Sequence, residues 1–113
     1  MSDLVYVSIT GLQLKNIWHA PVFWRHATAS MLQAQKAKGC LSADARSIEG
    51  VHHTLSVWIS REAMLNYLTK GAHLNAMKTF KKIATGKVHG YETTTVPDWQ
   101  DVHKLWCEHG RSV

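Results

Sequence analysis

The sequence has little cysteine, and its apolar residues never gather into a long run. Its two cysteines, Cys40 and Cys107, form no CxxC pair and no disulfide spacing, which is typical of a protein kept in a reducing compartment. No segment approaches the ~20 apolar residues of a membrane span. The N-terminus, MSDLVYVSIT, lacks the charged and apolar regions of a secretory signal. We therefore expect a cytoplasmic protein that does not associate with membranes.

Motifs typical of metal, nucleophile or nucleotide sites are also missing. There is no HxxxH, HExxH or Cys–His spacing, and the neighbours His52 and His53 would point to opposite faces of a strand. His19 and His26 are two helical turns, or ~10 Å, apart, which is too far to share one ion. Neither a GxSxG elbow nor a glycine-rich phosphate loop occurs. We therefore expect no metal, no flavin, no nicotinamide and no other cofactor.

Acidic residues are the scarcer charge, with 8 Asp and Glu against 13 Lys and Arg and a net charge of +5. Lysines gather around one expected helix, where they are typical of a solvated face: Lys70, Lys78, Lys81, Lys82 and Lys87. No recognised nucleic-acid module accompanies them, so we expect no nucleic-acid partner. The hydrophobic content of 45% is enough for the core of one domain spanning residues 1–113.

Glycine, proline and alternating apolar residues divide the chain into short elements. The expected strands are Leu4–Thr10 (ended by Gly11), Cys40–Ile48, Val51–Ile59 and Lys87–Val96, and Glu49–Gly50 forms a hairpin turn between the second and third. The expected helices are Pro21–Lys38, a short one from Arg61 to a break near Gly71, Ala72–Thr85, and a last one from Asp98 to His109. The connection after the first strand carries Leu12, Leu14, Ile17 and Trp18, and we expect it to be covered.

The order β-α-β-β-α-β, followed by a terminal helix, predicts an α+β ferredoxin-like sandwich with a four-stranded antiparallel sheet. Such a sheet carries helices on one face and leaves the other bare. The first strand offers apolar residues to both sides, with Val5, Val7 and Ile9 opposite Leu4 and Tyr6. A sheet that is apolar on both faces needs a second cover. A partner subunit is the simplest cover, so the pattern predicts a homodimer.

The helix over residues 72–85 places a histidine at the head of an apolar face. His73, Ala76, Met77, Phe80 and Ala84 follow the i, i+3, i+4, i+7, i+11 spacing. One interpretation is a buried imidazole that bonds a backbone carbonyl. The other is a general base or ligand-contacting donor, because imidazole titrates near neutral pH. Around it, Trp18, Trp24, Trp58 and Tyr67 describe either a small-molecule pocket or a tryptophan-rich core and dimer interface.

The stretch TLSVWISREAMLNYLTKGAHLNAMKTF, residues 54–80, resembles the antibiotic biosynthesis monooxygenase-like group of the dimeric α/β-barrel superfamily. The similarity lies in a strand ending at Trp58, a short helix with Glu62-Ala63-Met64, and Gly71-Ala72-His73 opening the next helix. The resemblance implies a homodimer whose sheets form a barrel, with each pocket between its own sheet and helices. Oxygenases of this group need no metal or flavin. A base deprotonates an electron-rich phenol or anthrone, and the resulting carbanion passes an electron to dioxygen.

Within the resemblance, Trp58 and His73 match the motif of the group, and we predict His73 as the catalytic residue. We add Tyr67, Trp24 and His26 from local geometry, and Met77 and Phe80 from the same helix face, as substrate-binding residues with Trp58. In the haem-degrading branch of the superfamily, an aromatic residue and the haem-ligating histidine align with Tyr67 and Met77. Methionine at the ligand position makes haem degradation the less favoured activity. The alternative to an oxygenase is a non-catalytic dimeric barrel that binds a small molecule or serves a structural role.

Overall fold

A computed structural model describes residues 4–69 and 71–112, apart from the side chains of residues 72–75. The elements alternate as the turn and capping signals predict. They are β1 (Val5–Leu14), the 3₁₀ turn η1 (Ile17–His19), α1 (Ala20–Lys36), β2 (Cys40–Ile48), β3 (Val51–Trp58), α2 (Arg61–Leu68), α3 (Gly71–Ile83), β4 (Ala84–Thr93), α4 (Trp99–His109) and β5 (Arg111–Ser112). None of the described helices is long and apolar enough to cross a membrane.

The sheet has the ferredoxin-like strand order, with β1 and β3 at its centre. The order is β2-β3-β1-β4-β5, and each neighbouring pair is antiparallel. β2 and β3 form the predicted hairpin, in which Glu49 and Gly50 both adopt positive φ values of 53° and 78°. Positive φ at both central residues is typical of the type I′ turns that suit hairpins. The predicted α+β fold class is confirmed, and β5 adds two residues to the edge beside β4.

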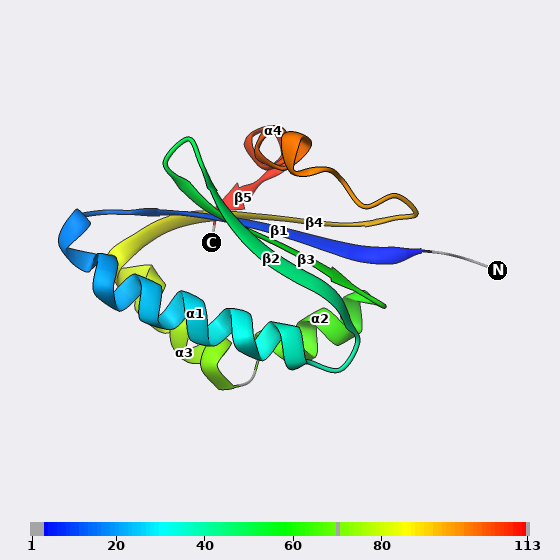
Figure 1. The fold of residues 1–113 in the computed structure, drawn as a ribbon, viewed down its shortest axis with the longest axis horizontal. Helices are drawn as coiled ribbons and strands as arrows, with labels where there is room; N and C mark the ends of the chain where they lie inside the picture. Colours follow the sequence, from blue (N-terminus) through cyan, green and yellow to red (C-terminus); the bar gives the residue numbers. More distant parts are fainter. Residues whose placement is uncertain (1–3, 70, 113) are drawn as a thin grey trace.

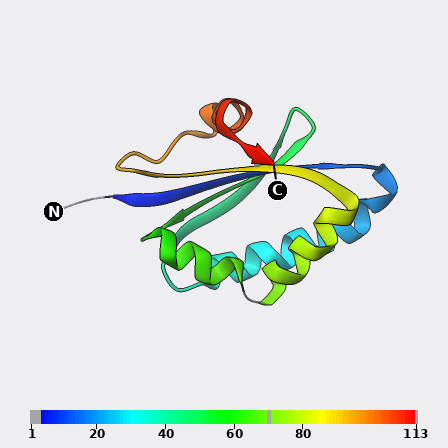
Figure 2. The ribbon, with the colours of Figure 1, turned by 180° about the vertical axis from the view of Figure 1, so that it is seen from behind.

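The second face of the sheet is not bare, so our expectation of helices on one face only is wrong. Helices α1, α2 and α3 lie on one side of the sheet, and α4 lies on the other (Figures 1 and 2). Val102 and Trp106 of α4 pack against Val7, Ile9 and Val57, and all five side chains are buried within the single chain. The terminal helix therefore supplies a cover that we had assigned to a partner subunit.

Gly11 explains why β1 continues beyond the predicted end at Thr10. A side chain at Gly11 would overlap the indole ring of Trp106, which lies across the strand at this point. The Trp106 Nε1–H donates to the carbonyl of Lys87 at 2.9 Å and so links α4 to β4. Gly11 is therefore a site of close packing within a ten-residue strand rather than the residue that ends it.

The longer β1 also moves the start of β4. We expected a helix to Thr85 and a strand from Lys87, but α3 ends at Ile83 and β4 begins at Ala84. Ala84 pairs with Leu14 at the far end of β1. Because β1 continues to Leu14, its backbone donors and acceptors extend the pairing with residues that local signals assign to the helix.

The apolar connection after β1 is not covered as we expected. Leu12 and Leu14 belong to β1, whereas Ile17 and Trp18 in η1 are 78% and 83% exposed. Asn16 caps this turn by accepting a hydrogen bond from the backbone N–H of Trp18 at 2.9 Å. The cap holds the turn in place without burying the indole ring, so Trp18 is not part of the described core.

Candidate functional site

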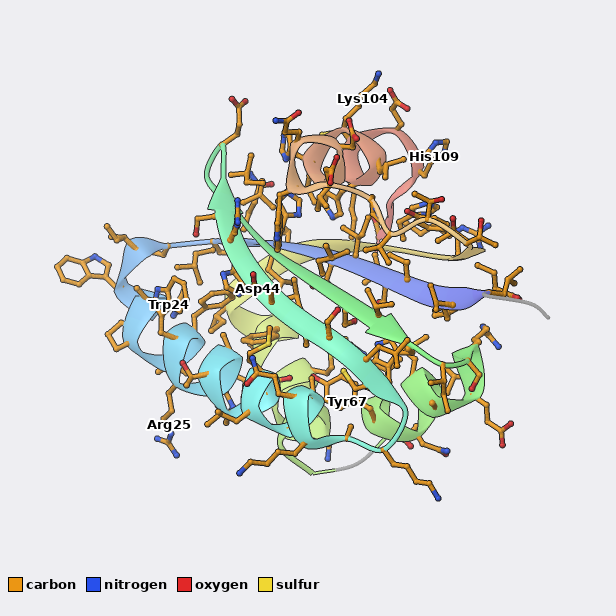
Figure 3. The ribbon with its side chains drawn as sticks, turned by 45° about the vertical axis from the view of Figure 1, so that its right-hand side comes forward. Trp24, Arg25, Asp44, Tyr67, Lys104 and His109 are labelled. Carbon is orange, nitrogen blue, oxygen red and sulfur yellow. The ribbon has the colours of Figure 1, made fainter. Side chains whose placement is uncertain are left out.

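A pocket of about 90 Å³ lies between the sheet and the three helices α1, α2 and α3, and it is partly open to solvent. It is smaller than the roughly 150 Å³ cavity that holds a benzene ring. A ligand larger than one ring must therefore extend out of the pocket or move the helices apart. Figure 3 shows Tyr67 on the pocket side of the sheet, whereas Lys104 and His109 of α4 lie on the opposite side.

The sheet provides a polar floor to this pocket. Ser8 of β1 lies opposite Ser56 of β3, and Thr10 lies opposite Thr54, and all four residues line the pocket. Their places follow from the strict alternation of apolar and hydroxyl residues in Val7-Ser8-Ile9-Thr10 and in Thr54-Leu55-Ser56-Val57. Within these two stretches the apolar residues face α4, so the hydroxyl residues face α1 and α3.

Helices α1, α2 and α3 provide an apolar roof. On α1, Phe23 and Ala34 are buried, and Ala27 and Met31 line the pocket. From α3, Phe80 and Met77 line it as well. A ligand in the pocket therefore meets hydroxyl groups on one side and hydrocarbon on the other, which favours a planar molecule with one polar edge.

Tyr67 lines the pocket, but its hydroxyl is already committed. Tyr67 Oη donates to the carbonyl of Ser30 at 3.0 Å, so the Ser30 hydroxyl, 2.8 Å away, donates to Tyr67 Oη. Burial raises the pKa of Tyr67 to about 12, partly opposed by the bond from Ser30. The phenol therefore stays neutral at physiological pH. Tyr67 provides a fixed wall and is not a base.

Trp58 is wholly buried beside this wall and does not line the pocket itself. Its ring stacks on Tyr67 with the centroids 5.2 Å apart. The Trp58 Nε1–H donates to Ser56 Oγ at 2.9 Å, and the Ser56 hydroxyl donates in turn to the carbonyl of Ser8 at 3.5 Å. Trp58 thus fixes one hydroxyl of the pocket floor.

Two other predicted binding residues, Trp24 and His26, also stand outside the lining. Trp24 is 49% exposed, and its ring meets the edges of Phe23 and His52. His26 Nε2 lies 3.3 Å from Thr79 Oγ1, and its ring meets the edge of Phe80. Both rings therefore contact lining residues without reaching the pocket.

The predicted catalytic residue, His73, lies on α3, and its side chain is outside the described part of the chain. Its role stays a prediction. On the same helix, Met77 lines the pocket at the position aligned with the haem-ligating histidine of the haem-degrading branch. The described lining therefore offers a thioether, not an imidazole, at that place.

His52 is a pocket residue that our sequence analysis missed as a binding candidate. It lines the pocket at the end of the polar floor, opposite Leu12 of β1. Burial lowers the pKa of His52, and the nearby His53 lowers it further. The alternation that places Ser56 and Thr54 on the floor also places His52 there, so this signal was available in the sequence.

The described lining carries a single charged residue, Lys81, and no carboxylate. Among the described side chains, which leave out those of residues 72–75, no group of three or more His, Cys, Asp or Glu could hold a metal ion. A cation without a neighbouring acid favours negative charge on a ligand.

No protein-family model and no curated protein matches the sequence. Solved structures match over most of the chain. A conserved Bacteroides thetaiotaomicron protein of unknown function, noted as a possible oxidoreductase, has a TM-score of 0.71 at 13% identity, covering 81% of this chain and 100% of that one. SnoaB, a cofactor-independent oxygenase from Streptomyces nogalater, has a TM-score of 0.68 at 10% identity, covering 83% and 98%.

A candidate antibiotic biosynthesis monooxygenase from Nitrosomonas europaea is also similar, with a TM-score of 0.68 at 13% identity over 79% of this chain and 88% of that one. The chain therefore has the fold of the antibiotic biosynthesis monooxygenase-like proteins, as the resemblance of residues 54–80 implied. At these identities the likeness concerns the fold, and activity has to be argued from the site.

Proposed function

We propose that this protein is a cofactor-independent oxygenase acting on a small aromatic molecule with an acidic O–H or C–H bond. The observation that carries the proposal is the pocket between sheet and helices, with its hydroxyl floor and apolar roof. The resemblance implies a substrate at this same place in the fold. The structural likeness to SnoaB, a cofactor-independent oxygenase, supports the same class of reaction.

The proposed reaction needs no oxidant other than dioxygen. A base removes a proton from the substrate and leaves a carbanion stabilised by the aromatic ring. The carbanion passes one electron to dioxygen, and the two radicals combine to form a C–O bond. The resulting peroxide loses water, so the ring C–H and O–H hydrogens of a phenol leave as one H₂O with one oxygen atom of O₂, and the other oxygen atom becomes a quinone carbonyl; in an anthrone a CH₂ group becomes the carbonyl in the same way. The protein has to take up a proton, stabilise an anion and exclude water.

The pocket residues suit these tasks. We propose His73 as the base, as the resemblance implies. Tyr67 cannot take this role near neutral pH because its pKa is raised to about 12. Lys81 is proposed to stabilise the developing anion, and Met77 and Phe80 to hold the aromatic ring away from water. The substrate-binding roles of Trp58, Trp24 and His26 remain predictions. These residues do not line the pocket, so they would act by holding the residues that do.

Oxygen uptake tests the proposal directly. The purified protein, with a chelator and no added flavin, should consume dioxygen with single-ring hydroquinones or catechols, which suit the small pocket. We expect His73→Ala to lower the rate roughly 10²–10⁴-fold while the melting temperature stays nearly unchanged, because the variant removes a general base. His109→Ala is the matched control, since His109 lies on α4 across the sheet.

One result would overturn the oxygenase, and another would overturn only the role of His73. If aromatic ligands bind but no dioxygen is consumed, the protein is the non-catalytic binding barrel of the alternative. If His73→Ala keeps full activity and instead loses about 2 kcal/mol of stability, His73 is a packing residue.

A further inference from the structure

One residue that lines the pocket, His52, carries a buried polar atom that the protein itself leaves without a partner. Among the described side chains, His52 Nδ1 alone is buried and makes no hydrogen bond. Buried polar groups are nearly always paired, and an unpaired one costs roughly 1–3 kcal/mol. Such an atom on a residue that lines a pocket requires an explanation, and a bound ligand provides one.

The other buried polar groups of the pocket are satisfied within the chain. Ser56 Oγ accepts from Trp58 and donates to the Ser8 carbonyl. Tyr67 and Ser30 bond each other. The unpaired atom of His52 is thus an exception within an otherwise complete network.

Aromatic packing holds the His52 ring in place. Its edge meets Phe23 at a centroid distance of 5.2 Å and Trp24 at 4.9 Å, and in both pairs the rings are nearly perpendicular. In the sheet His52 lies between Leu12 of β1 and Ser47 of β2. With two aromatic rings against it, the imidazole has little freedom to turn toward another protein group.

The surroundings also keep this imidazole neutral. Burial and the adjacent His53 both lower the pKa of His52. A neutral imidazole nitrogen is either a donor or an acceptor, depending on the tautomer, and a hydroxyl group can pair with both.

We propose that His52 Nδ1 forms a hydrogen bond with the hydroxyl group of the ligand, so that the pocket selects a phenol over an equally shaped hydrocarbon. The phenol lies with its hydroxyl edge on the floor of Ser8, Thr10 and Thr54 and with its ring against Met77 and Phe80. This inference rests on the pocket being the ligand site of the proposed function, but it does not depend on oxygenation.

Binding of phenol and of toluene, which has the same shape without the hydroxyl, tests the inference. The full chain is titrated with each compound in turn. We expect His52→Phe to bind phenol about tenfold more weakly than the wild type does, and to bind toluene within about twofold of the wild-type affinity. His52→Gln, which restores a donor and an acceptor, should recover part of the phenol affinity. On adding phenol, but not toluene, the ¹⁵N resonance of His52 Nδ1 should shift.

The matched control is His109→Phe, which exchanges the same residue types across the sheet and should change neither affinity. His52→Leu replaces His52→Phe if the larger ring prevents folding. Equal losses for phenol and toluene would overturn the inference, because His52 would then only pack. Unchanged phenol binding in His52→Phe would also overturn it, while leaving the oxygenase untouched. Absence of oxygen uptake with normal phenol selectivity would overturn the oxygenase alone.

Discussion

Gly11 and Trp106 form a contact in which the absence of one side chain makes room for another. The indole of Trp106 occupies the space that a Cβ at Gly11 would enter. It also meets the ring of His53 at 5.0 Å and lies below the Lys87 ammonium at 5.2 Å. A single glycine therefore determines how closely α4 approaches the sheet.

Gly11→Ala should destabilise the protein by about 1–3 kcal/mol, because the added methyl group forces the indole out of its place. Urea unfolding measures this cost. In a Trp106→Leu background most of the penalty should vanish, since the smaller side chain leaves room. An equal penalty in both backgrounds would show that the cost arises in the strand and not from contact with Trp106.

At the scale of elements, α4 is held to the sheet by a chain of histidines. His53 Nδ1 donates to the carbonyl of Thr10 at 3.1 Å, so its Nε2 is the acceptor for the Nδ1–H of His103, 2.8 Å away. His103 Nε2 is then free to accept from the thiol of Cys107 at 3.5 Å. In this arrangement His53 Nε2 carries no proton, so the bond from His103 needs His53 to be neutral.

Acidification should therefore loosen α4. Burial lowers the pKa of His53 below its ordinary value of 6.5, and His103 lowers it further, although the bond to Thr10 opposes this. Below pH 6.5 this histidine takes up a proton in the unfolded chain, whereas folded His53 does so only at its lower folded-state pKa. The free energy of unfolding is therefore largest above pH 6.5 and falls as the pH drops from 6.5 to the folded-state pKa. The neighbours of His53 include Trp106 of α4 and Arg46, the β2 residue opposite it. Neither carries a negative charge that would stabilise a protonated His53.

Thermal unfolding between pH 7 and 5 measures the effect, with a slope of at most about 1.4 kcal/mol per pH unit for one histidine. In His53→Phe this slope should flatten, even though overall stability falls. Hydrogen exchange should show α4 opening before β1 and β3 as the pH falls. A slope that His53→Phe leaves unchanged would assign the pH dependence to other groups, such as His89, whose pKa burial also lowers.

For the whole molecule, the position of α4 changes what a dimer can look like. The homodimer was predicted from apolar residues on both faces of the sheet, but α4 buries Val7 and Ile9 within one chain. Val5 and Tyr91, at the margin of that face, are only partly buried. A partner subunit therefore cannot pack directly on Val7 and Ile9 unless α4 moves, and the margin is the apolar surface left beside the helix.

We expect the homodimer to form at micromolar concentration, with a sedimentation mass twice the 12.7 kDa of the chain. A Tyr91→Lys substitution should shift it toward the monomer, because it places a charge on the half-buried margin. Lys104→Ala, which changes a mostly exposed side chain of α4, is the control. A monomer at all concentrations would contradict both the dimer and the two-sheet barrel implied by the resemblance.

The sequence by itself determined the order and type of the main elements, since these depend on local chemistry. Ser60 caps α2 by accepting from the N–H of Ala63, and the Glu49–Gly50 turn joins β2 and β3 as its residues predict. The prediction that His52 and His53 point to opposite faces is also confirmed, because alternation is a property of a single strand. Tyr67, Met77 and Phe80 do line one pocket, although their binding role remains a prediction.

Only the tertiary structure decided which helices pack on each face of the sheet. Alternation separates His52 from His53, but packing between distant segments places His52 in the pocket and His53 beneath α4. The same packing carries β1 past Gly11, because Trp106 comes from residues nearly a whole chain length away. Local signals extend over a few residues, whereas the position of α4 depends on the complementary shapes of the helix and the finished sheet.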